Sequence, residues 1–137
     1  MLGVSDTSPL NYLVLIKTEE VLPALYTAVL IPSQVLEELQ RPKTPDHVRL
    51  WASQLPSWVH VQEGDVSRFP TLNYGEAAGL ALAIDTHAEA MLVDDGEARF
   101  MPRAVGVVPI GTVAILGEAH RATLLDFDTT IFFCRMA

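Results

Sequence analysis

Five carboxylates lie far apart in the chain but at equivalent places, at or shortly after the points where an apolar run gives way to a helical pattern. They are Asp6, Glu38, Glu76, Asp94 and Asp95. In a parallel α/β sheet the carboxyl ends of the strands lie side by side, and ligands bind in the crevice there. A cluster of carboxylates repels itself and cannot stay fully ionised without a cation. Hard divalent ions such as Mg²⁺ and Mn²⁺ prefer oxygen ligands, so the pattern predicts a metal-dependent hydrolytic site.

Each acid also has an ordinary structural explanation. Asn73 and Glu76 have the spacing of a capping box at the start of a helix. Asp6 could simply shape the entrance to the first helix, and Glu38 could be an exposed helix carboxylate. The tripeptide Asp94-Asp95-Gly96 is by itself a turn signal. These local explanations do not account for the common position of all the acids at one edge of the predicted sheet.

The elements that must position these acids follow from the hydrophobic pattern, in which short apolar runs alternate with stretches of helical periodicity. Strands are predicted over residues 2–6, 28–31, 58–61, 90–93 and 105–110. Helices are predicted over residues 9–16, with Ser8 as N-cap and Pro9 as first helical residue, and over 18–26, 33–40, 48–55, 73–87, 96–104 and 111–120. This alternation indicates an α/β fold with three layers, α/β/α, around a central parallel sheet.

Length and composition favour a single domain over residues 1–137. Half of the residues are hydrophobic and the mean hydropathy is positive, so a real core can form. The net charge of −8 argues against a large phosphate-binding surface, although bound cations would reverse the field at an acidic site. Cys134 is the single cysteine, no apolar stretch approaches the about 18 residues of a membrane span, and the N-terminus lacks the basic segment of a signal peptide. We therefore expect no membrane association and a cytoplasmic location.

Other chemistries fit the sequence less well. The four histidines lack metal-ligand spacing, and there is no glycine-rich phosphate loop. A haloacid-dehalogenase-type phosphatase would need an aspartate where Ser8 stands, and a phospho-receiver domain would carry its acidic pair after the first strand. Arg99 falls one helical turn after Asp95, where it would either pair with the acids or hold a phosphate.

Four short motifs contain the candidate acids. They are Val4-Ser5-Asp6-Thr7-Ser8-Pro9-Leu10, Ile31-Pro32-Ser33-Gln34-Val35-Leu36-Glu37-Glu38-Leu39, Gly75-Glu76-Ala77-Ala78, and Leu92-Val93-Asp94-Asp95 followed by Arg99. In this order they resemble the PIN-domain family, whose best known members are the toxin ribonucleases of VapBC-type toxin–antitoxin modules. The resemblance covers roughly residues 2–125. Most members carry aspartate in the third motif, whereas one PIN-like branch carries Gly-Glu, as this chain does.

The resemblance implies a PIN-like, Rossmann-like fold and a metal-dependent endoribonuclease. It implies that Asp6, Glu38, Glu76 and Asp95 are catalytic acids that hold Mg²⁺ or Mn²⁺, with Asp94 as an assisting ligand. Asp95 is favoured over Asp94 as the fourth family acid. Because the third acid is a glutamate, one methylene longer than aspartate, the metal geometry would shift.

The resemblance also implies an RNA substrate, a cognate antitoxin protein as partner, and a homodimer. Carboxylates cannot bind RNA phosphates themselves, so basic side chains would have to guide the strand. The candidates are Arg41, Lys43, Arg49 and Arg99. An alternative stays open: a catalytically idle PIN-like module that binds a protein partner. The net negative charge and the short segment after Phe132-Phe133 favour it.

Overall fold

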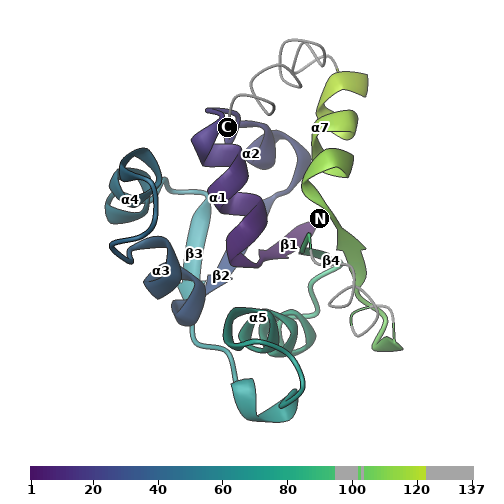
Figure 1. The fold of residues 1–137 in the computed structure, drawn as a ribbon. Helices are drawn as coiled ribbons and strands as arrows, with labels where there is room; N and C mark the ends of the chain where they lie inside the picture. The colour runs from purple at the N-terminus through teal and green to yellow at the C-terminus, as the bar shows by residue number, and fades with distance from the viewer. Residues whose placement is uncertain (95–101, 103, 123–137) are drawn as a thin grey trace.

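The computed structural model describes residues 1–94, 102 and 104–122. The strands are β1 (Leu2–Ser5), β2 (Ala28–Pro32), β3 (Val59–Gln62), β4 (Ala90–Leu92) and β5 (Val108–Ile110). The helices are α1 (Thr7–Leu15), α2 (Val21–Leu25), α3 (Ser33–Leu39), α4 (Asp46–Ser53), α5 (Tyr74–Asp85) and α7 (Thr112–Arg121), with a short 3₁₀ helix η1 (Val66–Arg68). Along the chain, strands and helices alternate as the hydrophobic pattern predicts (Figure 1).

Several of the predicted boundaries are wrong. The helix predicted over residues 18–26, for example, begins only at Val21. Helix α1 begins at Thr7, with Asp6 in the N-cap position, and not after Ser8. The last strand begins at Val108, because the chain before it forms a turn in which the N–H of Val105 and the N–H of Val107 both donate to the carbonyl of Pro102. The helix predicted over residues 96–104 falls almost entirely outside the described residues.

All five strands run parallel in one sheet, in the order β3-β2-β1-β4-β5. The chain first builds outward from β1 through β2 to β3, and then crosses back to place β4 on the other side of β1. The strand order therefore reverses between β1 and β4. In open α/β sheets this reversal leaves a crevice at the carboxyl ends of the two strands, where ligands bind.

Side chains alternate between the two faces of the sheet and build two separate cores. Val4 and Met91 pack with Leu80 of α5 on one face, whereas Ile31 and Leu92 belong to the larger core that α1, α3 and α7 share. Figure 1 shows α5 on the opposite side of the sheet from α1 and α7. The predicted three-layer α/β/α fold with a central parallel sheet is thus confirmed. No helix of the described residues is long and apolar enough to cross a membrane.

The loop after β3 is held tightly between α3 and α5, the helices that carry Glu38 and Glu76. The side-chain amide of Gln34 on α3 donates to the carbonyl of Gly64 at 2.9 Å. A Cβ on Gly64 would lie 2.2 Å from the carbonyl oxygen of Ala78 on α5, so only glycine fits there. This contact fixes the spacing of the two helices.

We therefore expect Gly64→Ala to lower the free energy of unfolding by about 1–3 kcal/mol, because the backbone of α5 must move away. Gly117→Ala is the matched control, since the nearest atom to its Cβ would be the Arg121 side chain at 3.7 Å. Alanine there should stabilise α7 by up to about 1 kcal/mol. Urea denaturation measures both effects. Equal midpoints for the two variants would refute the tight contact.

Candidate active site

Asp6 lies at the carboxyl end of β1, directly at the crevice between β1 and β4. Its N–H donates to the carbonyl of Leu92 at 2.9 Å, which continues the pairing of the two strands by one residue. Although Asp6 is the N-cap residue of α1, its side chain makes no capping hydrogen bond, and only 6% of the residue is exposed. The helix-entrance explanation therefore does not account for this carboxylate, which is buried with other acids around it.

Glu38 reaches the same place from α3. One of its carboxylate oxygens, Oε2, accepts a hydrogen bond of 2.6 Å from the hydroxyl of Thr7, the residue after Asp6. At the end of α3 the carbonyl of Glu38 accepts a further bond of 2.9 Å from the Thr44 hydroxyl. Glu38 is half-buried and oriented, whereas the neighbouring Glu37 is exposed. The explanation of Glu38 as a freely exposed helix acid is therefore wrong.

Gly75 at the start of α5 lies close to the Asp6 and Glu38 carboxylates. A Cβ at this position would lie 2.9 Å from Asp6 Oδ1 and 3.0 Å from Glu38 Oε1. Both oxygens therefore lie close to the space that Gly75 leaves free, and no farther apart than the sum of those lengths. The predicted third motif contains this glycine, but its steric role depends on residues from two other elements.

Glu76 is buried at the N-terminus of α5, with 6% of the residue exposed. Asn73 is the N-cap, and its side-chain oxygen accepts a hydrogen bond of 2.9 Å from the N–H of Glu76. This half of the predicted capping box is confirmed. Glu76 thus holds a helix-start position and also lies in the acidic cluster, since its charge acts on Asp6.

Asp94 follows β4 and binds the start of α7. Its two carboxylate oxygens accept hydrogen bonds from the N–H of Thr112 at 2.7 Å and from the Thr112 hydroxyl at 2.6 Å. A carboxylate at a helix N-terminus is stabilised by the unpaired N–H groups there. Sequence reasoning missed Thr112, although its place at the predicted start of a helix is a usable signal. Asp95 and Arg99 lie outside the described residues.

The electrostatics of Asp6 show that the four described acids share one environment. The pKa of Asp6 is raised from 3.8 to about 7, chiefly because burial disfavours the charged form, and the N–H of Thr7 opposes this rise. The charges of Glu76, Glu38 and Asp94 contribute to the same rise of the pKa. A strongly perturbed carboxyl in a crevice marks a functional site more often than a structural one.

The donor set suits a hard divalent cation, since it consists of carboxylate oxygens around a space that glycine keeps open. Among residues 1–94, 102 and 104–122, however, no three His, Cys, Asp or Glu side chains stand close enough together to hold one ion as they are oriented. Asp6 and Glu38 flank the space, and both oxygens of Asp94 are bonded to Thr112. Some of these side chains would have to rotate to complete a site from the described acids.

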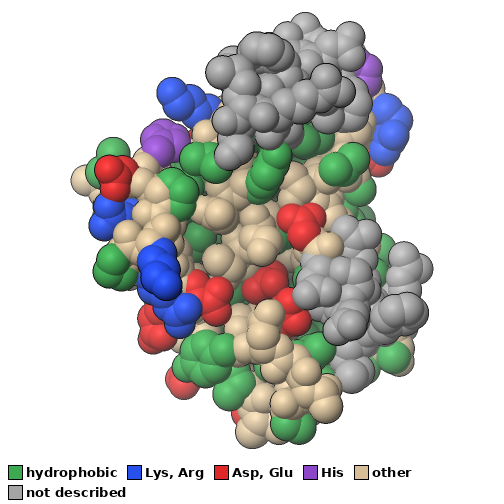
Figure 2. Space-filling view, in the orientation of Figure 1, with side chains coloured by type: hydrophobic (Ala, Val, Ile, Leu, Met, Phe, Trp, Pro, Cys, Tyr) green, Lys and Arg blue, Asp and Glu red, His purple; other side chains and the backbone are tan. Residues whose placement is uncertain are grey.

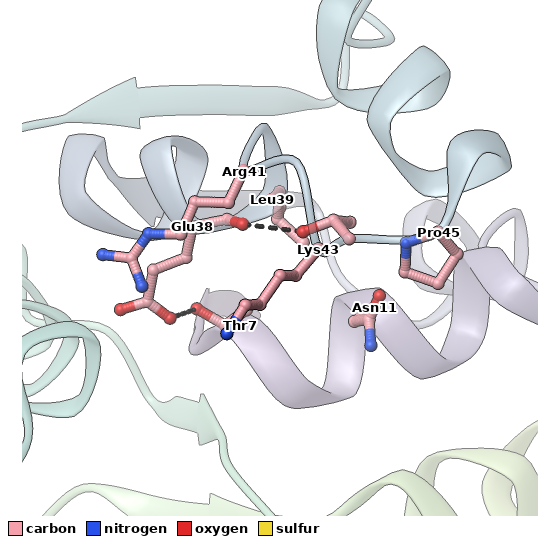
Figure 3. Close-up of a pocket in the computed structure, with 8 residues that line it drawn as sticks. Thr7, Asn11, Glu38, Leu39, Arg41, Lys43 and Pro45 are labelled. Carbon is pink, nitrogen blue, oxygen red and sulfur yellow. Dashed lines mark hydrogen bonds between the residues drawn. The ribbon is translucent and has the colours of Figure 1, made fainter.

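Basic side chains lie on one side of the acidic cluster. Figure 2 shows acidic side chains gathered where α1, α3 and α5 meet, with Lys and Arg side chains directly beside them. Arg41 and Lys43, in the turn after α3, line a pocket that also contains Glu38 (Figure 3). Arg49, by contrast, forms an ion pair with Asp46 on the surface of α4. Of the basic candidates in the described residues, Arg41 and Lys43 are therefore best placed to act with the acids.

The comparison with protein-family models agrees with this geometry. The PIN-domain family model matches residues 2–133, almost the whole chain. The chain therefore belongs to the PIN-domain family, and its fold is a nuclease-type fold. No curated protein matches it. The predicted family membership is thereby confirmed, over a longer stretch than the four motifs cover.

Proposed function

We propose that this protein is a metal-dependent endoribonuclease that hydrolyses RNA phosphodiester bonds. The observation that carries the proposal is the buried Asp6, whose pKa is raised to about 7 and whose Oδ1 lies, like Glu38 Oε1, beside Gly75. Family membership supports nuclease chemistry in general, because PIN domains are generally nucleases. The site geometry adds which carboxylates of this chain would perform it.

Asp6, Glu38 and Glu76 would hold Mg²⁺ or Mn²⁺, together with Asp95 and with Asp94 in an assisting role. When bound, such an ion lowers the pKa of a coordinated water and polarises the phosphodiester. Thr7 orients the Glu38 carboxylate by its hydrogen bond, and Thr112 does the same for Asp94. Asp6 must lose its proton to act as a ligand, so cation binding near neutral pH releases a proton.

A test is cleavage of RNA with Mn²⁺ by the wild type, Glu38→Gln and Glu37→Gln. Both substitutions remove one charge from α3, but only Glu38 reaches the site. We expect Glu38→Gln to lose activity by at least about tenfold, because a ligand for the cation is lost, and Glu37→Gln to keep it. Equal activity of all three proteins would refute the role of Glu38.

A second candidate is a catalytically idle PIN-like module that binds a protein partner. It is favoured by the absence of a ready three-ligand group in the part of the chain described, and by the engagement of both Asp94 oxygens with Thr112. Titration with Mn²⁺ separates the two candidates. If the wild type and a variant lacking Asp6, Glu38, Glu76 and Asp95 bind the ion equally weakly, the idle module is the correct description.

We further propose that the protein is the toxin of a toxin–antitoxin module, acts in the cytoplasm, and forms one domain over residues 1–137. The family resemblance supports an antitoxin partner and a homodimer. Light scattering on the purified protein measures the oligomeric state. Co-expression with the product of the adjacent gene tests the antitoxin: growth arrest by the protein alone and rescue by the neighbour are expected.

A further inference from the structure

A pocket of about 280 Å³ opens beside Glu38, between the start of α1 and the turn that follows α3. Its lining residues are Thr7, Asn11, Glu38, Leu39, Arg41, Lys43, Thr44 and Pro45. Its volume is close to the lower limit of about 300 Å³ for small-molecule sites, so it suits one small unit of a larger ligand. Because Thr7 and Glu38 belong both to the pocket wall and to the acidic cluster, a bound unit would lie next to the acids.

The charge of the pocket differs from that of the rest of the molecule. The chain carries a net charge of −8, yet this pocket combines Arg41 and Lys43 with the single acid Glu38. Neither basic side chain forms an ion pair with any of the residues that the structure describes. Figure 3 shows the Lys43 side chain extending across the pocket toward Thr7. Two unpaired cations over a polar pocket are suited to a phosphate group.

The opposite side of the pocket offers a different kind of contact. Asn11 lies one helical turn after Thr7 on α1, so the two side chains share a face of that helix. Asn11 Oδ1 is buried and accepts no hydrogen bond from the described residues. Figure 3 shows Asn11 near Pro45, on the side away from Glu38. A buried acceptor without a partner is rare and calls for a donor, such as an amino group of a ligand.

We propose that this pocket binds one nucleotide of the substrate strand, with its phosphate at Lys43 and Arg41 and its base edge at Asn11. Leu39 and Pro45 supply apolar contacts for the base, and the Thr44 hydroxyl adds a polar one. Because the orphan atom is an acceptor, we expect a base that offers it an exocyclic amino group, as cytosine does at C4, to bind better than uracil, which has a carbonyl oxygen at C4 and offers only its ring N3–H. The pocket thus selects the nucleotide next to the cleaved bond. The inference rests on the proposed ribonuclease function in one respect: that the bound nucleotide belongs to an RNA strand that the protein cleaves.

The test measures the binding of CMP and UMP to the full chain in the presence of EDTA, with inorganic phosphate as a third ligand. NMR titration gives the three affinities. CMP has an amino group at C4 and an acceptor at N3, whereas UMP has a carbonyl oxygen at C4 and a proton on N3. We expect CMP to bind about fivefold more tightly than UMP, the size of one hydrogen bond, and phosphate to bind more weakly than either. Lys43→Ala should weaken both nucleotides by about tenfold, since a charged hydrogen bond is lost.

Asn11→Ala should remove the preference for CMP and leave UMP affinity unchanged. Arg121→Ala removes the same charge as Lys43→Ala but lies in a surface pair with Glu118 on α7, so it should leave all three affinities unchanged. Thermal melting confirms that each variant is folded. The proposal is overturned if phosphate binds as tightly as CMP, if Lys43→Ala has no effect, or if Asn11→Ala leaves the CMP preference intact.

These outcomes are independent of the ribonuclease assay. Nucleotide binding with the expected pattern, but no RNA cleavage with Mn²⁺, would keep the pocket and refute the enzyme. RNA cleavage without nucleotide binding would keep the enzyme and refute the nucleotide pocket. If both hold, the wild type should cleave RNAs with cytosine at the cut bond and RNAs with uracil there at different rates. Asn11→Ala should cleave the two kinds of RNA at equal rates.

Discussion

Asp6→Asn should lower Mn²⁺-dependent RNA cleavage by about 10³-fold and, at the same time, stabilise the metal-free protein at pH 8. The activity falls because an amide is a much poorer ligand than a carboxylate for a hard cation, and a metal contributes several kcal/mol to such reactions. The stability rises because the amide is uncharged, so folding no longer buries a negative charge next to other acids. A structural acid would not give this combination of a lost activity and a gained stability.

The pH dependence of the stability has a definite sign. Asp6 has a pKa of about 7 in the folded protein and 3.8 as an unperturbed group, so the folded state holds its proton more tightly. The contribution of Asp6 to the free energy of unfolding is therefore largest below pH 4. It falls as the pH rises from about 4 to about 7. At about 1.4 kcal/mol per pKa unit, the loss is on the order of 4 kcal/mol.

Chemical denaturation of the metal-free protein between pH 4 and pH 8 measures this loss. Asp6→Asn should remove most of the decline, whereas Asp85→Asn should keep it, since Asp85 is an exposed acid paired with Arg68. Mn²⁺ at pH 8 should raise the wild-type melting temperature and leave Asp6→Asn unchanged. A wild type whose stability rises over this pH range would contradict the burial of Asp6 among other acids.

Gly75→Ala should reduce cleavage by about 10²-fold and weaken Mn²⁺ binding, although no ligand is removed. The new Cβ would lie 2.9 Å from Asp6 Oδ1 and 3.0 Å from Glu38 Oε1, closer than such contacts normally are. At least one carboxylate must move, and displacements of about 1 Å in an active site cost about this much. RNA cleavage and Mn²⁺ titration of the purified variant measure both effects.

Gly79→Ala on the same helix is the control. Its Cβ would meet Met91 Cε at 3.0 Å, the end of a flexible side chain in the core, far from any carboxylate oxygen. Each alanine should stabilise α5 by about 1 kcal/mol through its higher helix propensity, and the cost of local strain is subtracted from this gain. If Gly79→Ala loses activity as much as Gly75→Ala, the effect belongs to α5 as a whole and not to the space between Asp6 and Glu38.

The fold was largely predictable because its signals are local. Short apolar runs located the five strands, and helical periodicity located the helices between them. An alternation of strands and helices along the chain is typical of a parallel sheet. Boundaries were less predictable. Ser8 and Pro9 resemble a helix start, but the chain turns into α1 two residues earlier because Asp6 continues the pairing of β1 with β4 through its N–H.

The candidate site was predictable as a set of positions and not as a set of contacts. The sequence alone determined that acids follow β1 and β4 and lie on α3 and near the start of α5, because hydrophobic period and chain order are local properties. Only the tertiary structure decided that Thr7 holds Glu38, 31 residues away, and that Thr112 holds Asp94, 18 residues away. It also decided that Gly75 leaves free the space beside the Asp6 and Glu38 carboxylates. Such contacts depend on strand order and register, which bring together side chains that no local pattern relates.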